Sequence, residues 1–417
     1  MHLFWLLLFL ALVLVPGIAV LKLQNAQNTQ VDGSAQGRSQ RSESKRIQKL
    51  KQHRKTFKES TPKTRVGSLF GQLQEKPHCA GVLQCHTEEV TCFAFHPKKR
   101  CLLSCSSDRS VRVWWDPMDK QARFSSVTLF TCAASEYKVK FPDSAEACCW
   151  SKDGQLILFV LSHTRAIRSY DVLKNKKLLS GSLDVVSTQK SSVKDIELDP
   201  LRRYFVTYDD NSSFVVWNMR GSVLTRVDTH QVRNNQMAIS PDGRFIASAG
   251  FIGDVYLWEI LFQKDSNEFI ELRKVIDLKG HRAGVKGLAF SHDRKKVATV
   301  CKDRTIRIWN IDVKYKLEED AKLLFSLEPW DTQVDLLQVA FSPDDNLLAV
   351  VGNDSVAFYL LETRKLITIL RGCTGQVGID IKKFSFSGDG TLLATIGQGQ
   401  SFISLWNVPV MPSFSNV

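Results

Sequence analysis

The sequence lacks the residue patterns that mark zinc modules and nucleotide sites. Its ten cysteines include no CxxC pair, and zinc modules depend on paired short spacings. It also has no glycine-rich phosphate loop and no paired-carboxylate signature. The sequence therefore predicts no metal, no cofactor, no catalytic residue and no small-molecule substrate.

The cysteines favour a reducing compartment. Most of them lie among apolar residues, as in VTCFAF and ACCWS, which is typical of reduced thiols in a core. Such usage indicates a cytosolic or nuclear environment. The chain has 417 residues, of which 43% are hydrophobic, and this is enough to form a buried core.

Excess positive charge is confined to one segment. The formal net charge is +13, and between Lys22 and Arg65 twelve Lys and Arg face three acidic residues, which leaves +9 there. The rest of the chain is close to balanced. Only this segment therefore needs an explanation through anionic partners.

The amino terminus carries an uncharged run, LFWLLLFLALVLVPGIAVL, over residues 3–21. Nineteen residues are about the length that spans a bilayer as a helix. No Lys or Arg precedes the run, and basic residues follow it, so the positive-inside rule places the rest of the chain in the cytosol. We predict a transmembrane signal-anchor over 1–21. A cleaved secretory signal, with Gly17 and Ala19 at the cleavage site, is the alternative.

Residues 22–78 are predicted to be a flexible basic linker. The part over 24–44 is rich in Gln, Ser, Asn and Gly, as in a tether. Apolar residues near helical spacing in KRIQKLKQHRKTFKES predict a short basic amphipathic helix. Its cations suit lipid headgroups or the phosphates of RNA or ribosomes; the alternative is a solvated charge run that only enforces topology. The candidate contact residues are Lys45, Arg46, Lys49, Lys51, Arg54, Lys55 and Lys58.

From residue 79 to 410 the chain repeats one pattern, with 411–417 as a tail. Seven Pro, Asp or Gly turns such as ISPDGR and FSGDGT separate β-rich runs. Each unit closes on an aromatic residue, at spacings of 41 to 56 residues. These residues are Trp114, Tyr170, Trp217, Trp258, Trp309, Tyr359 and Trp406. The period predicts an all-β, seven-bladed propeller. PHCAGVLQC, before the first unit, is expected to supply the outer strand of the last blade.

Two units, 195 residues apart, share a further set of polar residues. Each has a His, a hydroxyl residue, an Asp and a Trp in the same register. The sets are His86, Ser104, Asp108 and Trp114, and His281, Thr299, Asp303 and Trp309. A His–hydroxyl–Asp set also occurs in nucleophilic catalysis. Its recurrence within strand repeats favours a structural network, so we do not expect catalysis here.

These motifs resemble WD repeats. GHRAGVKGLAFSHDRKKVATVCKDRTIRIWNI, from Gly280, is a near-complete example, although the turn Asp is replaced by Asn211, Ile252, Asn353 and Gln400 in four other units. QMAISPDGRFIASAGFIGDVYLWEI, followed by LKGHRAGVKGLAFSHD, resembles a branch of WD-repeat proteins of the endoplasmic reticulum membrane. That resemblance implies a single-pass protein whose cytosolic propeller binds the stress-sensing kinase of translation initiation factor two.

Three functions compete on the sequence alone. The first is a non-enzymatic scaffold that docks proteins at a membrane. The second is an RNA- or ribosome-binding adaptor that uses the basic linker. The third is an enzyme with a central-channel site that carries no known motif. The sequence does not identify the partner-binding face.

The predicted topology can be tested at two glycosylation sequons, at Asn211 and Asn353. Sequons are silent in the cytosol and are used in a secretory lumen. We expect both asparagines to be unmodified, so that endoglycosidase treatment leaves the electrophoretic mobility unchanged. A mobility shift would place the propeller in the lumen.

Overall fold

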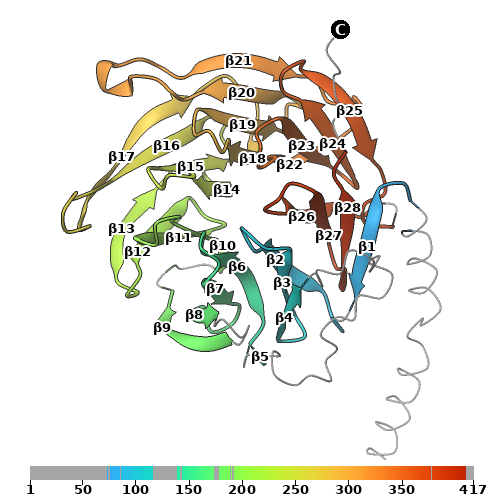
Figure 1. Cartoon of the computed structure of the whole chain (residues 1–417). Coiled ribbons are helices and arrows are strands. Elements are labelled where there is room, and N and C mark those ends of the chain that lie inside the picture. Colours follow the sequence, from blue (N-terminus) through green and yellow to red (C-terminus); the bar gives the residue numbers. More distant parts are fainter. Residues whose placement is uncertain are drawn as a thin grey trace, which may run out of the picture. The chain divides into compact units, whose positions relative to one another are not determined.

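The computed structural model describes residues 73, 76–84, 86–115, 139–140, 143–172, 178–187, 189, 192–376 and 378–409. These residues form seven four-stranded antiparallel sheets arranged in a ring about a central axis (Figure 1). The predicted seven-bladed propeller is therefore confirmed. The apolar run 3–21 and the basic residues of 45–58 lie outside the described part. Within that part, no helix has the length and apolar character needed to cross a bilayer.

Six blades take four strands in chain order, and the seventh takes its outer strand from the start of the chain. Blades 1 to 3 comprise β2 (Val90–Phe95), β3 (Cys101–Ser106), β4 (Ser110–Trp115), β5 (Val139–Lys140); β6 (Ala145–Trp150), β7 (Leu156–Leu161), β8 (Ala166–Val172), β9 (Leu178–Val186); and β10 (Val193–Leu198), β11 (Tyr204–Asp209), β12 (Ser213–Asn218), β13 (Val223–Asp228).

The remaining blades follow the same plan. Blades 4 to 6 comprise β14 (Asn234–Ile239), β15 (Phe245–Gly250), β16 (Val255–Phe262), β17 (Phe269–Leu278); β18 (Val285–Phe290), β19 (Lys296–Cys301), β20 (Ile306–Asn310), β21 (Lys322–Leu327); and β22 (Leu336–Phe341), β23 (Leu347–Gly352), β24 (Ser355–Leu360), β25 (Lys365–Leu370). Blade 7 comprises β26 (Ile381–Phe386), β27 (Leu392–Gly397), β28 (Phe402–Asn407) and β1 (Cys79–Gln84). A short 3₁₀ turn, η1 (Tyr315–Leu317), precedes β21.

The second strand of each blade is deeply buried. Every residue of β3, β7, β11, β15, β23 and β27 is buried. These strands are covered on both faces by the neighbouring blades, so they read as nearly continuous small and apolar runs such as LILFVL. In the outer strands β13 and β25, by contrast, half of the residues are exposed. The core therefore lies between blades.

A register shift recurs near the start of the inner strand of all seven blades. In β2 it lies between Val90 and Cys92, and in β26 between Ile381 and Lys383. The other five shifts lie at the equivalent step of β6, β10, β14, β18 and β22. A β-bulge bends its strand and redirects the next side chain. These bulges fix which residues approach the central axis.

Pairing between β1 and β28 closes the ring. The strands run antiparallel, with Leu83 opposite Ile403 and Gln84 opposite Phe402. Outside the ladder, the Asn407 backbone N–H donates to the His78 carbonyl at 2.7 Å, and Lys76 Nζ donates to the Gly372 carbonyl at 2.6 Å. The expected closure by the segment before the first repeat is confirmed. It leaves β28 paired on both sides.

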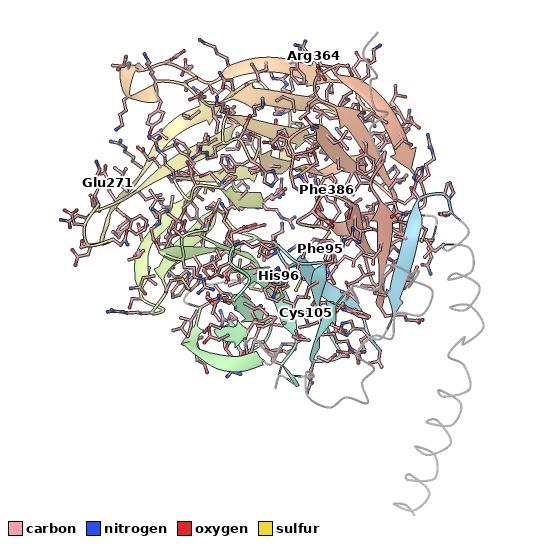
Figure 2. All side chains as sticks on the ribbon, viewed as in Figure 1. Phe95, His96, Cys105, Glu271, Arg364 and Phe386 are labelled. Atoms are coloured by element: carbon pink, nitrogen blue, oxygen red, sulfur yellow. The ribbon has the colours of Figure 1, made fainter. Side chains whose placement is uncertain are left out.

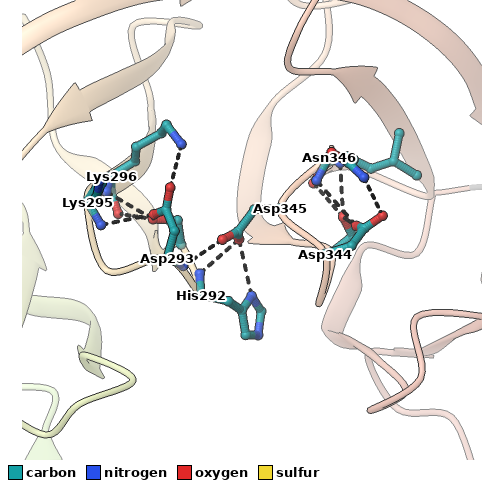
Figure 3. Close-up of polar contacts among 10 residues, drawn as sticks. His292, Asp293, Lys295, Lys296, Asp344, Asp345 and Asn346 are labelled. Atoms are coloured by element: carbon teal, nitrogen blue, oxygen red, sulfur yellow. Dashed lines mark hydrogen bonds and ion pairs between the residues drawn. The ribbon is translucent and has the colours of Figure 1, made fainter.

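Side-chain hydrogen bonds hold the turns between the first and second strands, and some of them also link neighbouring blades. In five blades a serine hydroxyl donates to the Asp two residues later, as Ser291 Oγ does to Asp293 at 2.5 Å. Between blades 5 and 6, the Asp345 carboxylate accepts the backbone N–H groups of His292 at 2.8 Å and Asp293 at 2.6 Å (Figure 3). These contacts add polar links at one end of the packed blade interface.

Ring closure predicts a sharp effect of truncation. Removing residues 1–84 deletes β1, unpairs one side of β28 and exposes the apolar surface that Leu83 covers. Burial of one such side chain contributes about 2 kcal/mol to the free energy of unfolding, and the hydrogen bonds between β1 and β28 add to this. We expect the thermal midpoint to fall by at least about 5 °C, with more aggregation in light scattering.

A shorter truncation, removing residues 1–67, provides the control because it leaves β1 in place. We expect it to melt like the full chain. Equal melting of both truncations would mean that β1 does not hold the ring closed.

Candidate functional site

The first polar set comes together at the boundary of blade 1 with the loop before it. His86 Nδ1 lies 3.1 Å from Asp108 Oδ2, and His86 Nε2 lies 2.7 Å from Ser104 Oγ. The Trp114 indole N–H donates to the same hydroxyl at 2.8 Å. The consistent tautomer carries its proton on Nδ1, so that Ser104 donates to Nε2 and accepts from Trp114. Burial lowers the pKa of His86, which keeps the ring neutral.

The second set repeats this geometry in blade 5 with one change. His281 Nε2 lies 2.7 Å from Thr299 Oγ1, which accepts the Trp309 indole N–H at 2.9 Å. His281 Nδ1 lies 2.9 Å from Thr305 Oγ1 and 3.5 Å from Asp303 Oδ2. Thr305 Oγ1 donates to Asp303 Oδ1 at 2.6 Å, as Ser110 does to Asp108 in blade 1, so the change is the longer distance from the imidazole to the carboxylate. Burial lowers the pKa of His281 to about 4.

Neither set has the geometry of a nucleophilic site. Ser104 and Thr299 are fully buried, and an indole N–H occupies each hydroxyl oxygen. A nucleophile needs an open approach to the reacting atom. In this arrangement the hydroxyl joins the central Trp to the His of the preceding loop. The sets therefore fix loop positions.

Part of this network extends further than the sequence pattern indicated. The indole of Trp217 donates to Thr207, that of Trp258 to Ser248, and that of Trp406 to Thr395. Within the described strands, five blades thus share an indole–hydroxyl bond. Its signal is a hydroxyl residue ten or eleven positions before the Trp. Blades 2 and 6 end in Tyr, and Tyr359 donates to the Glu328 carbonyl at 2.8 Å instead.

A charged cluster lies where the inner strands approach the axis. Lys383 Nζ of β26 lies 3.3 Å from Asp195 Oδ2 of β10, which joins blade 7 to blade 3. Each of these residues directly follows a bulge. Burial, together with Asp195, raises the pKa of Glu197 to about 8. Sequence reasoning missed this cluster because its members lie 188 residues apart.

An exposed apolar patch lies on two loops of blade 4. We define the blade-4 patch as Val232, Phe251 and Ile252. The relative exposures of Val232 and Phe251 are 71% and 67%. Val232 also has a φ of 63°, which is rare for a β-branched residue. Exposed apolar groups held by a strained backbone are typical of binding surfaces.

Buried hydrogen bonds hold the patch in place. The fully buried Gln231 side chain donates from Nε2 to the carbonyls of Asp254 at 3.0 Å and Ser248 at 3.3 Å. The Phe251 N–H donates to the Arg233 carbonyl at 3.0 Å, which ties the two loops together. The patch is therefore preorganised, so a partner meets little ordering cost.

The described part also contains a sulfur cluster that spacing alone did not reveal. The thiols of Cys92, Cys105 and Cys148 lie within 4.8 Å of one another and are buried. A second group joins His281, Cys301 and Asp303. There the imidazole bonds to two hydroxyls, and the Cys301 thiol donates to the Ala283 carbonyl at 3.0 Å. The second group is thus explained by hydrogen bonds within blade 5.

Comparison with known proteins agrees with the propeller. The family model described as "WD domain, G-beta repeat" matches residues 77–114 and 272–310. These two segments contain both complete His–hydroxyl–Asp–Trp sets. The chain therefore contains two segments that match the WD-repeat model.

The chain is similar to transducin beta-like protein 2. It is 29% identical to the mouse protein over 290 residues, which cover 69% of this chain and 64% of the relative. Against the human protein it is 28% identical over 320 residues, or 76% and 69% of the two chains. The chain thus spans less than two thirds of the mouse relative. Actin-interacting protein 1 of Drosophila melanogaster is 24% identical over 349 residues, which cover 82% of this chain and 52% of that relative.

The buried His281 predicts an acid-sensitive fold. Its pKa is about 4 in the folded state against 6.5 in the unfolded chain, so the unfolded chain binds more protons between these values. The stability contribution is present above pH 6.5 and is lost as pH falls towards 4. For His281→Gln we expect a shallower loss of unfolding free energy over that range, by up to about 3 kcal/mol, measured by urea denaturation at several pH values.

The matched control is His230→Gln, because the His230 side chain is 84% exposed. We expect it to keep the wild-type pH profile. Parallel profiles for His281→Gln and the wild type would show that His281 is not responsible for the acid sensitivity.

Proposed function

We propose that this WD-repeat propeller is a non-enzymatic scaffold that binds protein partners through the blade-4 patch. The observation that carries the proposal is the rigid exposure of Val232 and Phe251 on loops locked by Gln231. Aromatic anchors on a preorganised surface supply most of the affinity in protein interfaces. The four-stranded blades provide the stiff support that such loops need.

A binding role also suits the polar networks. Their His and hydroxyl groups are buried and saturated, and they stabilise loops rather than open a reaction site. Arg233 and Asp210 pair beside the patch at 3.3 Å, with both side chains more than half exposed. Such a charged rim around an apolar centre is the usual anatomy of a protein interface.

We further propose that the scaffold acts at the endoplasmic reticulum membrane with its propeller in the cytosol. The uncharged run over 3–21 and the basic residues after it support this orientation. The resemblance to membrane-anchored WD-repeat proteins supports the stress-sensing kinase of initiation factor two as a partner. In this scheme the anchor concentrates the propeller near a membrane-bound kinase.

A second candidate function rests on the basic linker. Its charge of +9 between Lys22 and Arg65 favours contact with RNA or ribosomes. That mode does not need the blade-4 patch. The two functions can therefore be separated by changing each element alone.

Binding of the kinase's purified cytosolic domain to the full chain, in nanodiscs, tests the proposal. We expect Phe251→Ser and Val232→Ser each to weaken affinity by at least about 10-fold, because each removes an apolar anchor from the centre of the contact. Biolayer interferometry gives the dissociation constants.

Leu201→Ser is the matched control. Leu201 is 65% exposed, but it lies on the turn between β10 and β11, at the opposite end of its blade from the patch. We expect wild-type affinity. Equal affinity for all four proteins would remove the patch from the interface, and no binding by the wild type would exclude the kinase. Salt-sensitive polysome association, lost on deleting 38–58, would favour the RNA-binding function instead.

A further inference from the structure

Three thiols from three strands meet where blade 1 packs on blade 2. Cys92 is on β2, Cys105 on β3 and Cys148 on β6. The Sγ atoms of Cys92 and Cys148 are 3.4 Å apart, and all three Sγ atoms lie within 4.8 Å of one another. Their exposures are 2% or less. Figure 2 labels Cys105 on the ribbon of blade 1.

The blade pattern does not require sulfur at these positions. Cys92 and Cys105 form the first pair after the bulge, where the other blades place residues such as Gly287 with Val300 and Gln338 with Val351. Cys148 occupies the next inner-strand position of its blade. There the other blades carry Phe93, Ile196, Met237, Leu288, Val339 and Phe384. Apolar residues therefore satisfy the packing elsewhere, and the convergence of three thiols is particular to this interface.

The three thiols act on one another's pKa, and a nearby cation acts on two of them. Burial raises the pKa of the Cys105 thiol, and its contacts with Cys148 and Cys92 raise it further. Burial acts in the same direction on Cys92, but hydrogen bonds from Cys105 and Cys148 hold the pKa of Cys92 well below its usual value. The Lys383 ammonium also acts favourably on Cys92 and Cys148.

The donor set selects the class of metal. Thiolates are soft ligands and suit Cu⁺, zinc and iron–sulfur clusters. Structural zinc is almost always four-coordinate, whereas among the described residues no fourth His, Cys, Asp or Glu joins the three sulfurs. An iron–sulfur cluster likewise uses four protein ligands. Of these metals, Cu⁺ is the soft monovalent ion, and a set of three sulfurs without a fourth protein ligand suits it best.

We propose that Cys92, Cys105 and Cys148 form a buried, all-sulfur site for one Cu⁺ ion. Binding forms bonds from copper to the three sulfurs and releases the three thiol protons to solvent, with no electron transferred. The bound ion joins β2 and β3 of blade 1 to β6 of blade 2. Loading would therefore stabilise the interface between these two blades.

Anaerobic titration of the full chain in nanodiscs with Cu⁺, against the chelator bathocuproine disulfonate, tests the site. We expect one tightly held copper per chain and only sulfur ligands in copper-edge X-ray absorption. Cys105→Val and Cys148→Val should weaken retention by at least about 100-fold. These variants should still fold, because Val300 and Val339 occupy the equivalent positions in blades 5 and 6. Circular dichroism and thermal melting check the fold.

Cys373→Ser is the matched control, since Cys373 is equally buried and lies in blade 6–7 packing away from the cluster. We expect it to bind copper like the wild type, and copper should raise the melting temperature of both. Retention of copper by the two valine variants would overturn the proposal. So would loss of copper from the wild type at the chelator concentration that strips the variants, or oxygen or nitrogen among the ligands.

Discussion

The structure depends on each blade burying both faces of its second strand against its neighbours. A sheet covered on two sides has no solvent face, so β7 and β15 tolerate small and apolar residues almost throughout. That requirement cannot be met at the ends of a linear array. It is met here because β1 leaves the start of the repeat region and pairs with β28. Burial of the second strands therefore requires a closed ring. The packed blades in turn hold the loops that connect their strands.

The fold could be predicted from the repeats because the residues that mark each blade lie close together in the sequence. A turn residue, an apolar run and a closing Trp recur in order within each unit, and Trp309 and Trp114 need buried space wherever they occur. The closing strand was predictable for a different reason, since residues 79–84 had no partner strands in sequence. These inferences needed no knowledge of distances between blades.

The rest depended on pairings that one blade does not reveal. The bulges arise from register between strands, so the approach of Lys383 to Asp195 could not be read from either segment. Cys92 and Cys148 are 56 residues apart without a ligand-like spacing, and only the packing of blade 1 on blade 2 brings them together. Val232 and Phe251 resemble ordinary strand residues in sequence. Their exposure follows from loop geometry set by the buried Gln231.

The ion pair between Lys383 and Asp195 also limits how the disc can be used. It connects the inner strands of blades 7 and 3, which are not neighbours, and therefore crosses the centre of the ring, which we call the hub. Threading a peptide or nucleic-acid strand through the hub would have to break this pair. The pair therefore opposes passage of a chain through the hub and leaves the rims and the two flat ends of the ring as the accessible surfaces.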